Sequence, residues 1–411
     1  MYKYPSFLAM MIIGVLFFIF GFVTWLNGSL IPYLKVICDL NEFQALFVTF
    51  AFYIAYTVMA LPMAVILEKT GYKKGMALGL FVMSLGALLF IPAALSGKFL
   101  VFLTALFTLG TGLTILQTAS NPYITLVGPI ESAAMRISIM GLINKSAGVL
   151  APLLFTALVL SDIGSMSELA SINTQELAHK LIKPYIGMAA VLFMLTLFVW
   201  FSSLPELEFE EDPYDDENIF GFPRVVLGAM ALFFYVGIEV IAGDTIGLYG
   251  QTLGVVNATA LTAYTMSFMV AGYLVGVFFI PKFLSQEKAL VSSAFLGIIF
   301  LFGVAYSSTN ESHIIPGLPD SVAFVAMLGL ANALVWPTIW PLALQDLGKH
   351  TAKGSALLIM AIAGGAVLPL VFGKVAQITA DMQSAYFVGI VCYVMIFLYG
   401  RYWHKMSSWR V

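Results

Sequence analysis

Two carboxylates, Glu239 and Asp244, lie in the segment GIEVIAGDTIG, within a run from Val225 to Leu248 that is otherwise almost wholly apolar. An uncompensated charge at the centre of an apolar membrane segment costs at least about 2.5–3.5 kcal/mol. Each acid is therefore expected to be protonated, paired with a cation or directed into a wet cavity. Such groups can bind a proton or a sodium ion that moves together with a solute. The structural alternative is an ion pair that only holds two helices together.

Lys145, in INKSAGVLAPLLF, is the single basic residue deep in an apolar segment. It is a candidate counter-ion for Glu239 or Asp244 and a candidate hydrogen-bond donor to a substrate. A third interpretation is that its long side chain extends to water at the nearby membrane surface. The histidines all fall in predicted loops or the tail, which excludes a histidine proton relay within the membrane: His179, His313, His350 and His404.

The spacing of the two acids separates them on a helix. Five residues at about 100° each place Glu239 and Asp244 about 140° apart, so a regular helix cannot direct both into one narrow cavity. We expect one acid to face a central cavity and the other to face a neighbouring helix, and the sequence leaves open which. The glycines of this stretch permit either a bend that brings both acids to one cavity or the close approach of a neighbouring helix: Gly237, Gly243, Gly247 and Gly250.

The composition indicates the environment of these residues. The chain has 411 residues, of which 61% are hydrophobic and only 10% charged, whereas soluble domains carry about 25% charged residues. A membrane-spanning helix needs about 20 apolar residues. We therefore predict an all-α integral membrane protein whose twelve spans are 6–34, 42–67, 75–95, 99–126, 135–160, 185–204, 223–250, 258–281, 289–307, 321–344, 354–378 and 383–402.

Two connections are longer than the others. Residues 161–184 are predicted as a polar loop with an amphipathic pattern, and residues 205–222 contain a run of acids from Glu206 to Glu217. The acidic segment is predicted to be a solvated cytoplasmic linker that extends by self-repulsion. It divides the chain into two six-helix bundles, residues 1–204 and 223–411.

The two halves echo each other in sequence. FFIFGFVTWLNGSLIPY, beginning at Phe17, overlays without a gap on FFYVGIEVIAGDTIGLY, beginning at Phe233. In this overlay Gly28 aligns with Asp244. The similarity favours a duplicated six-helix unit, an architecture in which transporters bind substrate near the membrane midplane between the repeats.

The distribution of lysine and arginine predicts the orientation. Of the 19 basic residues, the loops on the side of the termini hold the large majority by our assignment of the spans. Because cytoplasmic loops are enriched in lysine and arginine, both termini are predicted to lie in the cytoplasm. We accordingly expect a multi-pass protein of the inner (plasma) membrane, surrounded by lipid and functional as a monomer.

Amide and indole side chains cluster in particular spans. Amides suit pairs of hydroxyl groups, and an indole packs on the apolar face of a sugar ring, so these residues indicate a polyhydroxylated solute. The alternative is that they are helix-packing residues. The candidate substrate-binding residues are Asn27, Gln117, Asn121, Asn144 and Trp336.

Motifs of enzymes and pumps are missing. The sequence contains no GxSxG, HExxH, paired CxxC or Walker loop in a suitable context. We therefore expect no enzymatic activity, no resident cofactor or metal and no nucleic-acid partner. A receptor would need a soluble output domain, and a drug exporter would favour a more apolar cavity.

The segments ILQTASNPYITLVG and RISIMGLINKSAG resemble the fucose/galactose/glucose symporter family of the major facilitator superfamily. Similar stretches occur in the first, seventh, tenth and eleventh spans, so the resemblance covers nearly the whole chain. It implies alternating-access uptake of a monosaccharide, of the hexose or N-acetylhexosamine type, driven by a cation gradient. It also implies that Gln117, Asn121 and Asn144 line the sugar site, with Asn27 close by. An uncoupled sugar facilitator is the alternative.

The segment LEKTGYKKGMAL resembles the superfamily's cytoplasmic loop between the second and third spans. The resemblance implies that Glu68, Gly71, Lys73 and Lys74 form a cytoplasmic gate between conformations.

The chain departs from fucose-transporting members at two positions associated with proton coupling. It has Gly28 where they carry an aspartate in the first span, and Gln117 where they carry a glutamate in the fourth. Because Gly28 aligns with Asp244 in the internal overlay, we hypothesise that coupling resides on the seventh span, in Asp244 or Glu239. The co-transported cation is H+ or Na+, since a carboxylate with backbone oxygens also suits a hard cation.

Overall fold

The computed structural model describes residues 7–126, 133–160, 173–205, 218–279, 285–345, 347 and 350–409. Within these residues, twelve helical segments are long and apolar enough to cross a membrane, which confirms the predicted number. Their bounds are Leu8–Ile37, Glu42–Ala60, Lys69–Ser96, Phe99–Asn121, Arg136–Val159, Thr174–Phe201, Pro223–Thr252, Ala258–Phe278, Gln286–Tyr306, Asp320–Leu344, Lys353–Thr379 and Met382–Lys405.

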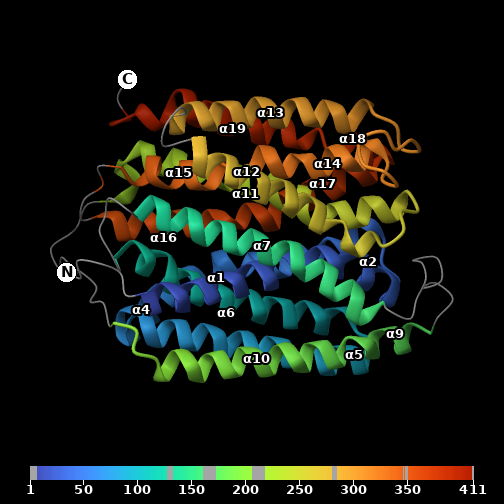
Figure 1. Cartoon of the computed structure of the whole chain (residues 1–411), viewed down its shortest axis with the longest axis horizontal. Helices are drawn as coiled ribbons and strands as arrows, with labels where there is room; N and C mark the ends of the chain where they lie inside the picture. Colours follow the sequence, from blue (N-terminus) through green and yellow to red (C-terminus); the bar gives the residue numbers. More distant parts are fainter. Residues whose placement is uncertain are drawn as a thin grey trace.

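The helices form two groups that follow the two halves of the sequence. The first comprises α1 (Phe7–Trp25), α2 (Asn27–Ile37), α3 (Glu42–Ala45), α4 (Phe47–Leu88), α5 (Phe90–Ser96), α6 (Phe99–Leu126), α7 (Ala133–Val159), α9 (Thr174–Lys180) and α10 (Ile182–Phe201). The second comprises η2 (Ile219–Gly221), α11 (Pro223–Thr252), η3 (Ala258–Ala260), α12 (Thr262–Phe279), α13 (Gln286–Tyr306), α14 (Asp320–Asn332), α15 (Val335–Leu344), α16 (Thr351–Met360), η5 (Ala361–Ala363), α17 (Gly364–Thr379), α18 (Met382–Ala385), α19 (Val388–Arg401) and η6 (Trp403–Lys405). In Figure 1 the blue-to-green helices fill the lower part and the yellow-to-red helices the upper part. The predicted linker, residues 206–217, lies outside the described residues.

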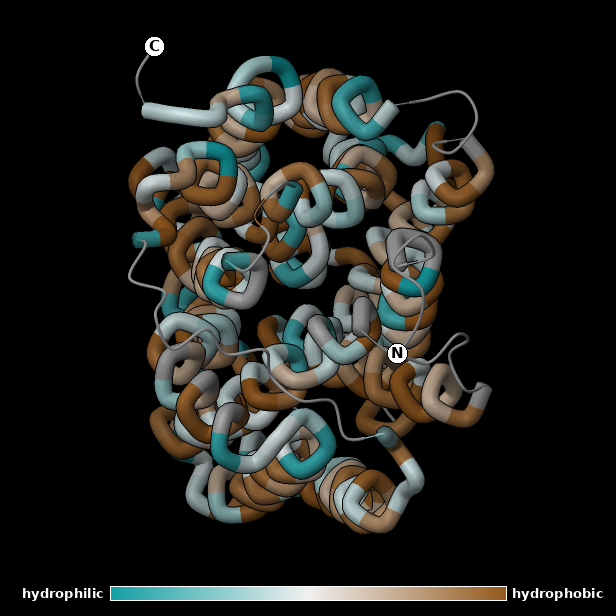
Figure 2. Tube along the Cα trace, turned by 90° about the vertical axis from the view of Figure 1, so that its left-hand side faces the viewer, coloured by the Kyte–Doolittle hydropathy of each residue, from teal (hydrophilic) through white to brown (hydrophobic). Residues whose placement is uncertain are grey.

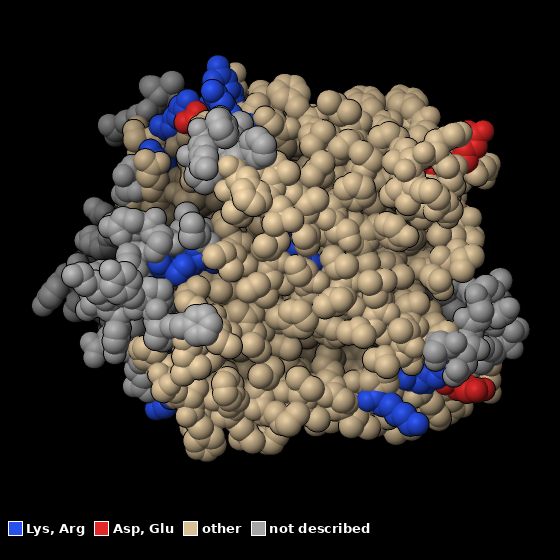
Figure 3. Space-filling view, viewed as in Figure 1, with Lys and Arg blue, Asp and Glu red and all other residues tan. Residues whose placement is uncertain are grey.

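The two ends of the bundle differ in what they carry. Helix α1 begins and η6 ends at the left face of Figure 1, here called the terminal face, and α2 ends at the opposite, distal face. Charged side chains gather at both faces and leave a broad, mostly uncharged band between them (Figure 3). Large apolar residues such as Leu154, Phe198 and Phe278 are exposed on the outside of the band, as expected for a surface in contact with lipid.

Helix α11 is the central element of the bundle. Of the twelve candidate spans it has the largest buried share, 72%, whereas the span containing α10 has only 28%. Viewed along the helix axes (Figure 2), most of the trace within the bundle is hydrophobic. The span that carries Glu239 and Asp244 is therefore surrounded by protein rather than by lipid.

The structure corrects the predicted loop at 161–184 in part. Residues 174–180 form α9, which leads directly into α10. The Asn173 side chain accepts a hydrogen bond from the backbone N–H of Gln175 and caps the helix. The amphipathic pattern has a tertiary cause, because Leu177 is buried and its carbonyl accepts a hydrogen bond from the Tyr33 hydroxyl at 2.7 Å. Residues 161–172 lie outside the described part.

Three spans are interrupted near the middle of the bundle. Between α1 and α2 the break lies at Leu26, and between α14 and α15 it lies at Ala333 and Leu334; the eleventh span passes through the 3-10 helix η5. The dihedrals at Leu26, Ala333 and Leu334 stay right-handed helical, so the interruptions are irregularities of helix geometry and not unwound segments. Asn27 and Trp336 follow the first two breaks closely, so both candidate binding residues lie at such interruptions.

Hydroxyl groups and glycines join the two halves toward the distal face. Ser29 donates to the carbonyl oxygen of Thr259 at 2.6 Å, and the hydroxyls of Thr156 and Thr259 are 2.8 Å apart. A Cβ added at Gly28 would overlap the Thr262 hydroxyl and lie 3.0 Å from the Gly243 carbonyl oxygen. The glycine at position 28 therefore permits α2 to approach the backbone of α11 and the Thr262 side chain at the start of α12.

Gly28→Val is expected to prevent this close contact and to shift the protein toward a state open at the distal face. The Thr262 hydroxyl cannot simply turn away, because it donates to Gly243 O at 2.7 Å. The measurement is thiol modification of a Thr259→Cys reporter in a background without Cys38 and Cys392, where Gly28→Val should raise the modification rate several-fold. Gly187→Val is the matched control, since nothing lies within 4 Å of its added Cβ. Equal rates in both variants would contradict the prediction.

Candidate functional site

A buried ion pair joins the two halves. The Nζ of Lys145 on α7 lies 2.7 Å from Oε1 of Glu239 on α11, with side-chain exposures of 10% and 9%. The same Oε1 accepts a hydrogen bond from the Tyr235 hydroxyl at 2.8 Å. The lysine also lies over the ring of Trp25, 4.5 Å from the ring centroid, a cation–π contact. Lys145 is thus engaged inside the protein and does not extend to the membrane surface.

Trp25 occupies a narrow space made by glycines of both halves. A Cβ at Gly148 on α7 or at Gly243 on α11 would overlap the indole ring. Trp25 is 2% exposed and ends α1 immediately before the break at Leu26. The two glycines therefore place the aromatic partner of Lys145 at the contact between the halves.

Asp244 has a different environment from Glu239. It is 0% exposed, and its Oδ2 accepts a long hydrogen bond, 3.4 Å, from the hydroxyl of Thr49 on α4. Its Oδ1 has no hydrogen-bond partner within the described part of the chain. Asp244 consequently also faces the other half of the molecule, but through a hydroxyl instead of a lysine.

The two acids diverge on one helix, as their spacing predicts. Glu239 faces α7 and Asp244 faces α4. Helix α11 is continuous from Pro223 to Thr252, so the bend that would bring both acids to one cavity does not form. Its glycines serve close packing instead: an added Cβ at Gly237 would overlap the Leu368 side chain of α17, which packs directly against the glycine.

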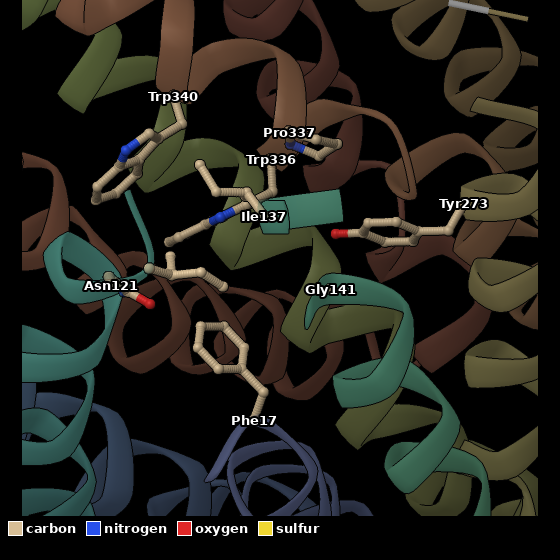
Figure 4. Close-up of a pocket in the computed structure, with 9 residues that line it drawn as sticks. Phe17, Asn121, Ile137, Gly141, Tyr273, Trp336, Pro337 and Trp340 are labelled. Atoms are coloured by element: carbon tan, nitrogen blue, oxygen red, sulfur yellow. The ribbon is translucent and has the colours of Figure 1, made fainter. Parts of the chain in front are cut away.

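An aromatic pocket lies between the halves, shown in Figure 4. It is lined by Phe17, Asn121, Ile124, Ile137, Gly141, Tyr273, Trp336, Pro337 and Trp340. The rings of Trp336 and Trp340 stack with centroids 5.3 Å apart, and the Tyr273 hydroxyl points toward the middle of the pocket (Figure 4). A Cβ at Gly141 would come within 2.7 Å of the Tyr273 ring. Gly141 therefore leaves room for that ring at the pocket wall.

The ion pair lies one helical turn beyond the pocket. Gly141 precedes Lys145 by four residues on α7, so these two residues lie on the same face of that helix. Tyr235 precedes Glu239 by four residues on α11 and likewise shares a face with it. The Tyr235 ring lies near the Trp336 ring, with centroids 6.4 Å apart. The Lys145–Glu239 ion pair, with one member from each half, therefore adjoins the inner end of the pocket.

Two of the five predicted binding residues, Asn121 and Trp336, line the pocket, and the other three do not. Gln117, one turn deeper on α6 than Asn121, donates from Nε2 to the Tyr56 hydroxyl at 2.9 Å.

The remaining two are engaged or enclosed in this conformation. Asn144 donates from Nδ2 to the carbonyl oxygen of Phe17, a pocket residue, at 3.4 Å. Asn27 is 1% exposed, and its Nδ2 has no hydrogen-bond partner among the described residues. Neither amide is among the residues that line the pocket.

Comparison with known proteins identifies the family. The sequence model described as the Major Facilitator Superfamily matches residues 13–370. The chain belongs to the major facilitator superfamily. This protein is also 34% identical over 394 residues to a glucose/galactose transporter of Brucella abortus, with 94% of this chain and 92% of the relative covered. It is 32% identical to a putative glucose/galactose transporter of Helicobacter pylori, covering 99% and 100% of the two chains.

More distant relatives include symporters. The L-fucose-proton symporter of Escherichia coli is 27% identical, with 94% of this chain and 91% of the relative covered. A crystal structure of the E. coli fucose:proton symporter matches this major facilitator protein with a TM-score of 0.75 and 24% identity, covering 98% and 100% of the two chains. A D-xylose-proton symporter structure matches with a TM-score of 0.70 and 16% identity, covering 96% and 97%. These likenesses confirm the major facilitator fold, and the family and relatives are transporters rather than enzymes.

The predicted gate residues of this major facilitator protein lie where α4 turns between the second and third spans. Gly71 has φ 76°, a left-handed conformation that favours glycine. Lys73 donates from Nζ to the Ser202 carbonyl oxygen at 2.6 Å, and Lys74 is exposed. The Glu68 side chain lies outside the described residues.

Sequence reasoning missed several pocket residues, chiefly Phe17 and Tyr273. Tyr273 continues a buried stripe with Met266 and Met269, whose spacing of three and four residues marks one face of α12. Phe17 begins the internal overlay with Phe233, and the sequence indicates only its place in that repeat. The helical spacing of Met266, Met269 and Tyr273 was the signal available in the sequence, and such spacing does not distinguish a pocket wall from a packed core.

Proposed function

We propose that this protein is a secondary active transporter that imports a monosaccharide by alternating access, coupled to a cation gradient. The observation that carries the proposal is the aromatic pocket, whose walls come from both halves. A solute bound there contacts both bundles, so their relative motion can expose it first to one side and then to the other. Most of the relatives described above are named as sugar transporters or symporters, which supports a sugar as the solute.

The chemistry of the pocket suits a ring with both polar and apolar faces. The stacked indoles of Trp336 and Trp340 offer flat apolar surface, and the Asn121 amide and Tyr273 hydroxyl offer hydrogen bonds. A hexose or N-acetylhexosamine matches this combination. Gln117, Asn144 and Asn27 are proposed to reach the sugar in other states of the cycle.

Asp244 is proposed as the coupling residue, and Glu239 as the partner of Lys145. An ionised carboxylate that is fully buried with one long hydrogen bond is poorly stabilised, so the environment of Asp244 in this state suits a bound proton. Glu239, in contrast, has a cation at 2.7 Å. The named proton symporters among the relatives support H+, and Na+ is the other candidate that the transport assay distinguishes.

The position in the cell is proposed from the charge distribution. We propose that both termini lie in the cytoplasm and that the protein lies in the inner (plasma) membrane as a monomer in lipid. The concentration of basic residues at the terminal face supports this orientation. The distal contacts through Ser29, Gly28 and Thr259 then close the external side in this conformation. Glu68, Gly71, Lys73 and Lys74 are proposed to form the cytoplasmic gate.

Purified protein is expected to bind its sugar through the paired indoles. In a thermal-shift panel of glucose, galactose, fucose, mannose and N-acetylglucosamine, only cognate sugars should raise the melting temperature. Trp340→Ala should weaken binding of the cognate sugar by about 10-fold or more, because a stacked aromatic contact contributes about 0.5–1.5 kcal/mol beyond its buried area. Trp200→Ala is the control, because Trp200 is 50% exposed on α10. If no sugar of the panel binds or is taken up by proteoliposomes, the proposed function fails.

An uncoupled sugar facilitator is the second candidate. The feature that favours it is the presence of Gly28 and Gln117 where fucose-transporting members carry acids. A facilitator equilibrates sugar and never accumulates it. Uptake into proteoliposomes with an imposed proton or sodium gradient separates the two functions, because only the symporter concentrates sugar inside.

A further inference from the structure

The charge balance at the inner end of the pocket is set by one contact. Lys145 is the only lysine or arginine of the described residues that lies near the middle of a span, and Glu239 neutralises it at 2.7 Å. Gly141 and Lys145 share a face of α7, and their backbones are about one helical turn, roughly 6 Å along the axis, apart. The inner end of the pocket therefore adjoins a cation whose charge is already compensated.

The other charged groups add no positive charge at the inner end of the pocket. Arg136 keeps its charge at the terminal end of α7, nine residues before Lys145, where its Nε donates to the carbonyl oxygen of Ile124 at 2.8 Å. Asp244 lies on the same helix as Glu239 and adds a second acid. The pair contributes no net charge, so an anionic substrate gains no attraction from the inner end of the pocket. The carboxylate of such a substrate would be buried there without a cation to pair with it, which is unfavourable.

We propose that Glu239 is a specificity-determining residue: by occupying Lys145 it restricts the site to uncharged sugars and excludes sugar acids such as hexuronates. This inference rests on the proposed sugar-transport function and specifies its substrate class. Glu239 acts through Lys145 and also accepts a hydrogen bond from Tyr235, whose ring lies near that of Trp336. Removal of its charge leaves the ammonium group available to a carboxylate at C6 of a sugar in the pocket.

The test compares matched sugars that differ only at C6. Binding of glucose, galactose, glucuronate and galacturonate to full-length protein in detergent is measured by calorimetry. The wild type should bind a neutral hexose and bind the corresponding uronate at least about 10-fold more weakly. Glu239→Gln should gain about 10-fold or more in uronate affinity, since a charge-assisted hydrogen bond is stronger than a neutral one.

Two variants show whether the gain comes from Lys145. The double variant Lys145→Met, Glu239→Gln should lose the gain, because the cation is gone. Asp244→Asn removes an acid from the same helix without freeing a lysine, so it should not acquire uronate binding. A gain that persists without Lys145, or no gain in a Glu239→Gln protein that shows a cooperative thermal transition, overturns the proposal.

The wild-type arm keeps the test decisive if Glu239→Gln does not fold. Wild-type protein that binds a uronate as tightly as the corresponding neutral hexose overturns the proposal without any variant. Absence of binding for every sugar would instead contradict the proposed function. Neutral-sugar binding without the predicted charge discrimination contradicts only the role of Glu239.

Discussion

Asp244→Asn is expected to abolish accumulation of sugar against its gradient while exchange of sugar across the membrane continues. One proton moving down a potential of 100 mV provides about 2.3 kcal/mol, which supports roughly 50-fold accumulation at one proton per sugar. Asparagine keeps the shape of the side chain and can still bond Thr49, but it cannot take up or release a proton. The variant should therefore carry sugar only until the internal and external concentrations are equal.

The measurement uses proteoliposomes with an imposed gradient. Wild-type protein should concentrate labelled sugar and alkalinise the medium as sugar enters, and Asp244→Asn should do neither while retaining counterflow exchange. Asp381→Asn is the control, because Asp381 is an exposed residue that caps α18. Repetition with a sodium gradient in place of the proton gradient identifies the ion. Undiminished accumulation by Asp244→Asn with either gradient would remove Asp244 from the coupling mechanism.

Neutralising one member of the Lys145–Glu239 pair is expected to be far more harmful than neutralising both. Loss of one partner of a buried ion pair costs about 3–5 kcal/mol, because the remaining charge is left uncompensated. Lys145→Met and Glu239→Gln should thus each lower the apparent melting temperature and reduce transport. The double variant removes both charges and should recover much of the stability, since apolar or neutral replacements of a whole pair are often nearly neutral.

Thermal unfolding in detergent and sugar exchange in proteoliposomes measure these effects in a double-mutant cycle. The control pair is Lys35 and Glu42, also 2.7 Å apart but with side chains 20% and 45% exposed. Neutralising that pair should change stability by about 0–1 kcal/mol, as exposed ion pairs do. Additive effects of Lys145→Met and Glu239→Gln would show that the pair is not energetically coupled. Recovered exchange in the double variant would show that Glu239 is not needed for sugar movement.

The membrane class and the location of the unusual charges were predictable from the sequence. Twelve apolar runs of sufficient length define the spans, because helix length and bilayer thickness are linked by a fixed rise per residue. The same local rule shows that Glu239, Asp244 and Lys145 lie deep in spans. Their divergence on α11 also follows from local geometry, since the angle between two helical residues depends only on their separation.

The contacts of those residues depend on how the helices pack. The sequence left open whether Lys145 pairs with Glu239, pairs with Asp244 or extends to the membrane surface. Helix rotation and the close approach permitted by Gly243 and Gly148 decide it, because they place Trp25 and Lys145 opposite Glu239 and leave Asp244 facing Thr49. No periodicity within one span contains that information.

The pocket also shows the difference between what residue types predict and what helix packing decides. Asn121 and Trp336 were identified by residue type, but Phe17, Gly141 and Tyr273 carry no chemical signal in the sequence beyond being aromatic or small. They become pocket residues because helices from both halves meet there. The sequence alone determined the membrane fold, the family resemblance and the deep charges, since these follow from local composition and motif. Only the tertiary structure decided which groups meet, because contacts between the halves depend on packing between segments far apart in the chain.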